Sequence, residues 1–420
     1  MRTEAAPGSL GGIPAETLAT HYGTPLLVID TDVLDGAVAR FAALGAELGV
    51  DVAYAGKALL VVALARRLAG TALRLDVCSL GELLTAERAG FPAARLVMHG
   101  CAKTDDELRA VANGRTMRIV IDNREEIARL ATLADAQRPV HVLLRVNTGI
   151  EAHTHLHVRT GGEDSKFGLP VTEVPAAVEE VQAVPALRLS GLHSHLGSQI
   201  FEVAPYAASL EILLSAYEHA RSLGAPVTDL VLGGGFGVSA RAASEPVDVA
   251  ALLQPLARRV ADLYAAAPVL PPRLGIEPGR AITAQAGTSL YRVIVVKRQG
   301  SRRFVIVDGG IADNPRPALY GAFHEPSLAG RTSTASLVET TVCGRSCEND
   351  RLVVAALPED LRAGDLLAMA STGAYTYSMA SNYNRFPKPA VVFAGGGTHR
   401  LAVRRETSVD VLRNDIDGFA

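Results

Sequence analysis

The 420-residue sequence predicts an α/β fold, a (β/α)8 TIM-type barrel followed by an all-β, Greek-key-like domain. Two observations support this prediction. Between about residues 25 and 285, short β-branched runs alternate with amphipathic helical runs, the pattern of βα units and a parallel sheet. After Arg280 helical runs become rare, and strand-like runs follow one another between turn residues. We therefore expect a barrel over residues 26–285 and a β domain over residues 286–420, which the residues before 26 also join.

Nine runs in the first part of the chain have the strand pattern, with helical runs such as 80–89 and 105–112 between them. In order, the strand runs are residues 26–30, 51–54, 74–77, 95–98, 118–122, 140–146, 189–193, 229–232 and 273–276. About eight parallel strands over about 250 residues fit a closed barrel better than an open sheet, which spacing alone leaves as an alternative. The first run is left open between the two domains.

The second domain shows strand runs separated by turn residues. They cover residues 289–296, 303–307, 335–342, 366–369 and 389–393. Polar side chains gather in three of its loops, residues 313–320, 343–350 and 373–384. Lone arginines and glutamates are surface charges in most proteins. Because Arg316 and Glu348 stand in such Gly- and Pro-rich loops, their grouping suggests a clamp for a zwitterionic ligand.

Composition limits the classes of function. With 48% hydrophobic and 20% charged residues, the chain is typical of a globular protein. The net charge of -3 comes with no basic, aromatic-interleaved run, so we expect no nucleic-acid partner. No apolar run is long enough for a membrane span, and no export segment is apparent, which predicts a cytoplasmic protein without membrane contact. Four cysteines make no disulfide framework and lack zinc-ligand spacing, so no metal is expected.

Lys57 is the most informative single residue. It ends the strand-like run 51–57, and a helical run begins directly after it. A lysine at the carboxyl end of a barrel strand points into the barrel mouth, where partial desolvation favours the neutral, nucleophilic amine. Lys57 is therefore a candidate Schiff-base lysine, although most lysines are surface charges.

Two glycine-containing motifs follow neighbouring strands. Residues 233–237 read Gly-Gly-Gly-Phe-Gly, and backbone amides without side chains around them can hold a phosphate. Residues 277–280 read Glu-Pro-Gly-Arg, where Glu277 suits a protonated pyridine nitrogen and Arg280 a phosphate or carboxylate. Each motif alone also fits a turn or a helix cap. Two such elements on consecutive strand ends favour an anion site.

Two histidines and one aspartate also stand at strand ends. His193 and His195 share one face if the strand continues, so one of them can stack on a planar ring, and no carboxylate follows at metal-ligand spacing. We expect His195 to be functional and His193 to be a core histidine. Asp76 either orients a ring histidine or caps the following helix.

Together these motifs resemble the alanine racemase-like, fold type III pyridoxal-phosphate decarboxylases. The resemblance runs from about Leu26 to Arg405 and rests on residues 54–58, 151–155, 163–168, 193–199, 233–237, 277–280, 316–321, 347–348 and 373–384, in that order. It implies pyridoxal 5'-phosphate as cofactor and a head-to-tail homodimer with shared active sites. The most similar branch decarboxylates meso-2,6-diaminopimelate to L-lysine and CO2 in lysine biosynthesis.

The resemblance also implies individual roles. Lys57 would form the Schiff base, Glu277 would pair with the ring nitrogen, and His195 would stack on the ring. The remaining cofactor contacts would come from Asp76, Ser198, Gly235, Gly279, Arg280 and Tyr375. The distal carboxylate of the substrate would be bound by Arg280, Arg316 and Tyr320, with Tyr375 nearby, and its distal ammonium by Glu348. Cys347, reaching across the dimer, would be the proton donor.

Three alternatives stay open. Leu59 stands where the family usually has Asn, and residues 98–103 and 347–350 also depart from the usual motifs, which leaves room for a decarboxylase of another or a carrier-linked amino acid. A non-catalytic pyridoxal-phosphate-binding protein would be a single barrel without a β domain. An amino-acid racemase would carry a catalytic tyrosine early in the β domain.

Overall fold

The computed structural model describes residues 8–150, 162, 164–240 and 248–416. The chain divides into two compact units. The barrel unit comprises residues 38–237 and 247–281, and the β unit comprises residues 1–37, 238–246 and 282–420.

The barrel unit is a closed ring of parallel strands. In spatial order these are β10 (Leu187–His193), β11 (Asp229–Val231), β12 (Arg273–Ile276), β4 (Asp51–Ala55), β5 (Arg74–Val77), β6 (Leu96–Met98), β7 (Arg118–Ile121) and β8 (Val140–Asn147). Pairing of β8 with β10 closes the ring, and the short β9 (Leu169–Pro170) pairs with the last two residues of β8, Val146 and Asn147. The predicted (β/α)8 barrel is confirmed.

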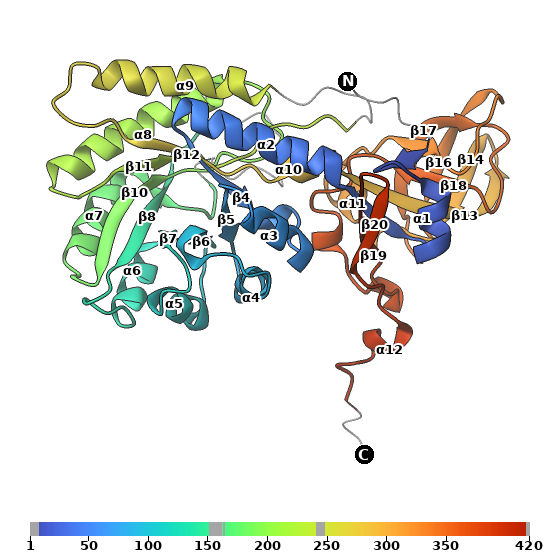
Figure 1. Ribbon diagram of the computed structural model, residues 1–420, viewed down its shortest axis with the longest axis horizontal. Helices are drawn as coiled ribbons and strands as arrows, with labels where there is room; N and C mark the ends of the chain where they lie inside the picture. The colour runs from blue at the N-terminus through green and yellow to red at the C-terminus, as the bar shows by residue number, and fades with distance from the viewer. Residues whose placement is uncertain (1–7, 151–161, 163, 241–247, 417–420) are drawn as a thin grey trace. The chain divides into compact units, whose positions relative to one another are not determined.

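Helices follow the strands along the chain and surround the barrel in Figure 1. They are α2 (Thr31–Leu48), α3 (Val62–Ala69), α4 (Leu80–Arg88), α5 (Asp105–Ala112), α6 (Arg124–Ala131), α7 (Val174–Gln182), α8 (Ala204–Ser222), α9 (Val249–Tyr264) and α10 (Arg280–Thr283). Local sequence sets several helix starts. The side chains of Ser79, Thr104 and Asn123 accept the backbone N–H three residues on and so cap α4, α5 and α6.

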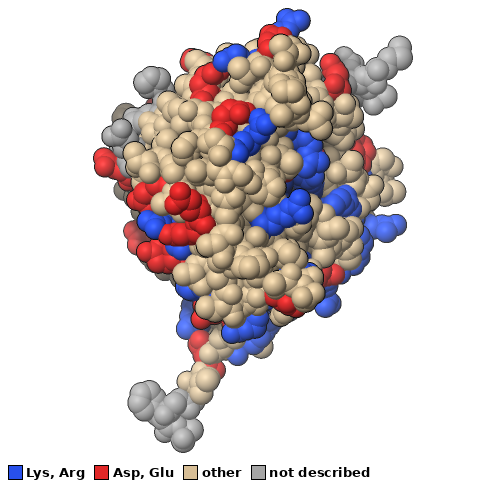
Figure 2. All heavy atoms as spheres, turned by 90° about the vertical axis from the view of Figure 1, so that its left-hand side faces the viewer, with Lys and Arg blue, Asp and Glu red and all other residues tan. Residues whose placement is uncertain are grey.

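Ion pairs join neighbouring helices on the surface of the barrel unit. Arg129 of α6 pairs with Asp105 of α5, and Arg124 of α6 pairs with Glu180 of α7. Figure 2 shows basic and acidic side chains interspersed over the visible face. Solvent screens exposed pairs of this kind, so the barrel depends on its apolar core rather than on them.

The inside of the barrel changes from apolar to polar along the strands. Val97, Val120, Leu143 and Val231, from four different strands, form one buried cluster. Successive residues of a strand point to opposite sides, so residues two positions further along share the same side. His99 is two residues beyond Val97. The polar site thus begins where the apolar filling of the barrel ends, at the carboxyl ends of the strands.

The β unit is built around one long sheet. Its order is β17 (Arg351–Pro358), β16 (Leu337–Cys343), β14 (Arg302–Val307), β13 (Gly287–Gln299), β3 (Leu26–Asp30), β19 (Ala390–Gly395) and β20 (Thr398–Val403), with β15 (Pro326–Leu328) on β18 (Leu366–Met369), which pairs with β13. Its other short elements are β1 (Ser9–Leu10), β2 (Ile13–Pro14), α1 (Ala15–Tyr22), α11 (Arg316–Tyr320) and α12 (Ser408–Val411).

Strand β3 is the strand run 26–30, which the sequence left open between the two domains. It pairs with β13 on one side and with β19 on the other, so residues 26–37 leave the range predicted for the barrel and join the β unit. Six described strands were not predicted: the longer β17 and β20, and the short β1, β2, β9 and β15. The side chains of β20 are all exposed or half-buried, and such a strand carries a weak apolar signal.

Two other findings bear on the class of protein. Among the described residues, no helix combines the length and the apolar composition required to cross a membrane. All four cysteines are free thiols.

Candidate active site

Lys57 lies in a single 3-10 turn, Gly56–Ala58, directly after β4. Its neighbours Gly56 and Ala58 are buried while Lys57 itself is exposed. A Cβ on Gly56 would lie 2.7 Å from the carbonyl oxygen of Asp76, and the Tyr54 hydroxyl donates to the Leu59 carbonyl at 2.7 Å, so the turn is fixed from both sides. Lys57 is thus an exposed residue on a fixed turn at the carboxyl end of β4, and its expected partial desolvation stays a prediction.

The predicted glycine loop approaches two other backbone segments more closely than a side chain would permit. A Cβ on Gly234 would lie 2.0 Å from the Glu277 carbonyl oxygen, and one on Gly235 would lie 2.3 Å from the Gly197 carbonyl oxygen. Gly233 and Gly235 both have positive φ, at 69° and 94°. The loops after β10, β11 and β12 therefore meet backbone to backbone and form a glycine cradle.

Polar side chains border this glycine cradle. The Ser198 hydroxyl accepts a hydrogen bond from Arg280 Nη2 at 3.0 Å. A Cβ on Gly279 would lie 3.1 Å from Ala58 Cβ, which brings the Glu-Pro-Gly-Arg segment next to the turn of Lys57. Three loops distant in sequence thus bring a guanidinium and a hydroxyl into contact beside the turn that carries an amine, a set of groups that can bind an anion.

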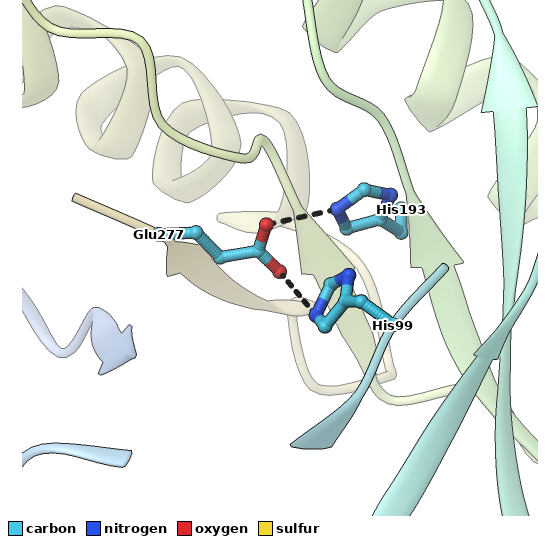
Figure 3. A group of neighbouring side chains, drawn as sticks. All are labelled: His99, His193 and Glu277. Atoms are coloured by element: carbon cyan, nitrogen blue, oxygen red, sulfur yellow. Dashed lines mark hydrogen bonds and ion pairs between the residues drawn. The ribbon is translucent and has the colours of Figure 1, made fainter. Parts of the chain in front are cut away.

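Glu277 lies at the centre of a buried polar cluster (Figure 3). His193, the last residue of β10, donates from Nε2 to Glu277 Oε2 at 3.0 Å. His99, directly after β6, places its Nε2 at 3.3 Å from Glu277 Oε1 and 3.5 Å from Asp76 Oδ1, which are ion-pair distances. Asp76, His99, His193 and Glu277 are named the Glu277 cluster below. Each carboxylate oxygen of Glu277 thus faces one imidazole.

The charges within the cluster follow from burial and these contacts. Burial alone would raise the pKa of Glu277, but the two histidines outweigh it and hold that pKa well below its usual value. Burial alone would lower the pKa of His99, but Glu277 and Asp76 raise it to about 9. Burial lowers the pKa of His193 to about 4 despite Glu277. Near neutral pH, Glu277 is therefore ionised, His99 is a cation and His193 is neutral.

The cluster also has the spacing of a metal site, since donor atoms of His99, His193 and Glu277 lie within 4.8 Å of one another. Its contacts suit another use, because the Nε2 atoms of both histidines already face the two carboxylate oxygens of Glu277. We interpret the two rings as hydrogen-bonding and electrostatic support for the Glu277 carboxylate.

His195 lies on the glycine loop. Its Nδ1 accepts the Gly234 backbone N–H at 3.2 Å, and a Cβ on Gly233 would lie 2.6 Å from the same nitrogen. Burial, followed by the charge of Lys57, holds the pKa of His195 well below its usual value, so the ring is neutral. His193 is buried and hydrogen-bonded, as expected of a core histidine, and its partner is Glu277.

Apart from Arg280, which belongs to the barrel unit, the predicted substrate residues belong to the β unit. The guanidinium of Arg316, buried at the start of α11, lies 5.5 Å from the ring centre of Tyr320 and 5.4 Å from that of Tyr375. Cys347 and Glu348 occupy a different, exposed loop. The Cys347 backbone N–H donates to Asn384 at 3.2 Å, and the Tyr383 hydroxyl donates to Glu348. The contacts found thus form two groups, Arg316 with two tyrosines and the Cys347 loop with residues 383–384.

Sequence reasoning missed three residues of the barrel mouth. His99 directly follows a barrel strand, a signal of the kind used for Lys57. Lys103 is fully buried and pairs with Glu126 at 2.9 Å. Arg145 of β8 lies over the ring of Phe167.

Residues 151–155 and Glu163 belong to the motifs that carry the family resemblance, and they lie outside the described residues.

Known proteins are similar to this chain over most of its length. The family model described as pyridoxal-dependent decarboxylase, pyridoxal binding domain, matches residues 34–284. A diaminopimelate decarboxylase of Actinosynnema pretiosum subsp. auranticum is 42% identical over 99% of this chain and 94% of its own length. The Bacillus subtilis diaminopimelate decarboxylase is 40% identical, with coverage of 97% and 94%.

Solved structures are similar over nearly the whole chain as well. The diaminopimelate decarboxylase of Helicobacter pylori complexed with L-lysine gives a TM-score of 0.87 at 27% identity, covering 95% of this chain and 98% of that one. The M. jannaschii diaminopimelate decarboxylase in complex with L-lysine gives 0.88 at 28% identity, covering 96% and 95%.

Proposed function

The chain belongs to the pyridoxal-dependent decarboxylases, and from this premise we propose that it removes CO2 from meso-2,6-diaminopimelate to give L-lysine. One observation carries the choice of substrate. Similarity to diaminopimelate decarboxylases spans 99% of the chain, so it includes the β unit with Arg316 and Tyr320 as well as the barrel.

The residues of the barrel mouth fit pyridoxal phosphate. The glycine cradle offers backbone amides where a Cβ would intrude, Glu277 offers an ionised carboxylate for a ring nitrogen, and Lys57 offers an exposed amine. When bound, the cofactor supplies an electron sink for the electrons that the departing carboxylate leaves behind.

The chain's own residues then have distinct tasks. Lys57 would hold the cofactor through its Nζ and would give way to the amine of the substrate. The ionised Glu277 would favour a proton on the ring nitrogen. The neutral ring of His195 supplies a flat face, and Arg280 with Ser198 holds an anionic group. Arg316 offers a buried guanidinium for the distal carboxylate of the substrate, which smaller amino acids lack.

A substrate panel tests the proposal. Purified protein loaded with pyridoxal phosphate is incubated with meso-diaminopimelate, lysine, ornithine and arginine, and the products are separated on a chiral column. We expect L-lysine and CO2 in equal amounts from meso-diaminopimelate and no comparable turnover of the others. Absence of turnover of meso-diaminopimelate would disprove the assignment.

Gly235→Ala is expected to weaken binding of pyridoxal phosphate about tenfold or more, because the new Cβ would meet the Gly197 carbonyl and a positive φ costs about 1–3 kcal/mol outside glycine. Titration of the apoprotein with pyridoxal phosphate, followed by fluorescence, measures the change. Gly90→Ala is the matched control, because Gly90 also has a positive φ but a Cβ there would point into open space, with no neighbour within 4 Å. Equal affinities in the two variants would contradict the glycine cradle.

We further propose a homodimer in which Cys347 and Glu348 complete the site of the other subunit. In support, Cys347 is exposed, and its loop contacts residues 383–384. Cys347→Ala is expected to lower kcat about 100-fold while leaving cofactor binding unchanged, because Sγ would deliver the proton to the product carbon.

Mixing two inactive variants tests the sharing of sites. Lys57→Ala and Cys347→Ala subunits, allowed to exchange, would form mixed dimers with one intact site each. In a random mixture half the dimers are mixed, so about a quarter of wild-type activity is expected. No recovery in a mixture that exchanges subunits would show that each site uses its own Cys347.

A further inference from the structure

We propose, resting on the function proposed above, that His99 is a positioning residue: its ring stands between Asp76 and Glu277 and fixes the Glu277 carboxylate, in orientation and in charge, for the ring nitrogen of the cofactor. Lys103 holds the loop that carries His99.

The backbone places His99 one residue past the end of β6. Its N–H donates to the Val77 carbonyl of β5 at 2.8 Å, so the strand pairing continues through His99. Nε2 then lies 3.3 Å from Glu277 Oε1 and 3.5 Å from Asp76 Oδ1. The ring also packs edge-on against His193, with centres 5.3 Å apart. One nitrogen is thus placed against carboxylates that come from two different parts of the barrel.

The loop after His99 is fixed by a buried ion pair. Lys103 Nζ donates to the Gly100 carbonyl at 2.8 Å, to the Val120 carbonyl at 2.6 Å and to Glu126 Oε2 at 2.9 Å. The second oxygen of Glu126 accepts the Lys103 backbone N–H at 2.9 Å. All three ammonium protons therefore have partners inside the protein. His99 is held by rigid structure and not by a mobile loop.

Charge gives His99 a role that packing alone does not. The charged and titratable groups that interact with His99 come from several elements of the barrel: Asp76, Glu82, His193 and Glu277, with Arg118 acting on Asp76 and Arg145 on His193. Asp76 and Glu277 are both buried, and burial followed by the charge of Glu277 raises the pKa of Asp76 to about 6. A cation between them permits both carboxylates to stay ionised.

Removing the positive charge of His99 should shift the pKa of Glu277 in one direction, upward. The pKa of Glu277 is low because two histidines outweigh its burial. Without the charge of His99, the upward effect of burial is opposed less strongly, and the pKa of Glu277 rises. Glu277 then takes up a proton at a higher pH, and a protonated Glu277 cannot keep the ring nitrogen of the cofactor protonated.

His99→Gln in the holoenzyme tests the inference, because glutamine keeps a hydrogen-bond donor without the charge. We expect kcat for meso-diaminopimelate to fall about 10- to 100-fold with KM changed less than about threefold. The acid limb of the kcat–pH profile should move to higher pH by about one unit or more. The pH titration of the cofactor's visible absorption should move in the same direction. His99→Lys, which restores a cation, should move both profiles back towards wild type.

His219→Gln, an exposed histidine of α8, controls for the substitution itself and should change nothing. Wild-type pH profiles in His99→Gln would overturn the proposal, and so would a uniform loss of kcat at every pH that His99→Lys does not relieve. The absorption titration needs no substrate. It therefore decides the role of His99 even if wild-type protein fails to turn over meso-diaminopimelate, the result that would instead refute the proposed function.

Discussion

Lys57→Ala is expected to lower decarboxylation about 10⁴-fold or more, the largest effect of any single substitution in the site. The chain would lose the amine that links it to the cofactor and that releases the product by displacing it. Because Lys57 is exposed on a turn fixed by buried neighbours, its removal should leave the fold intact. Loss of the visible absorption band of the lysine-bound cofactor, together with loss of lysine formation, measures the change.

The control for Lys57→Ala is Lys297→Ala, another exposed lysine, which lies on β13 of the β unit. This variant should keep both the absorption band and full turnover. If the cofactor stayed covalently attached to Lys57→Ala after borohydride treatment, which reduces a Schiff base to a stable secondary amine, another amine would hold the cofactor and the assignment of Lys57 would be wrong.

Glu277→Gln is expected to lower kcat about 10²- to 10³-fold. The substitution preserves the shape of the side chain but removes the charge that both His99 and His193 support. Without it the ring nitrogen loses its proton, and the cofactor accepts electrons less readily. Single-turnover release of CO2 measures the chemical step directly.

The matched control for Glu277→Gln is Glu211→Gln, a surface carboxylate paired with Arg259. This pair is exposed, so turnover should be unchanged. A Glu277→Gln enzyme with wild-type kcat would show that the charge of Glu277 does not keep the ring nitrogen of the cofactor protonated.

Much of the fold follows from periodicity. The strand runs 74–77, 273–276, 26–30 and 366–369 were predicted with the bounds that the structure gives them. A parallel barrel puts the carboxyl ends of all its strands at one rim, so residues that follow those strands could be assigned to one site. Periodicity could not predict which sheet β3 joins, because its partner strands β13 and β19 lie far from it in the sequence.

The pairing of side chains within the site was less predictable. His193 and His195 would share a face only if the strand continued, but β10 ends at His193, and His195 belongs to the following loop. Their tasks therefore differ, one bonding Glu277 and the other lying on the glycine loop. His99 was missed because its value depends on two carboxylates from residues 76 and 277, which only the closed barrel brings together.

The placement of β3 also affects the order in which the two units can fold during synthesis. The β unit is built from both ends of the sequence, so in Figure 1 the blue helix α1 lies beside orange and red strands of that unit. The barrel unit ends at Ala281, whereas β3 gains its second partner only when β19, Ala390–Gly395, has been synthesised. Domains generally fold as units during synthesis. The barrel is an insertion within the β unit, so we expect it to fold on the ribosome before β3 has paired with any strand. Truncation of the chain before β19 should leave one edge of β3 unpaired and therefore prone to aggregation.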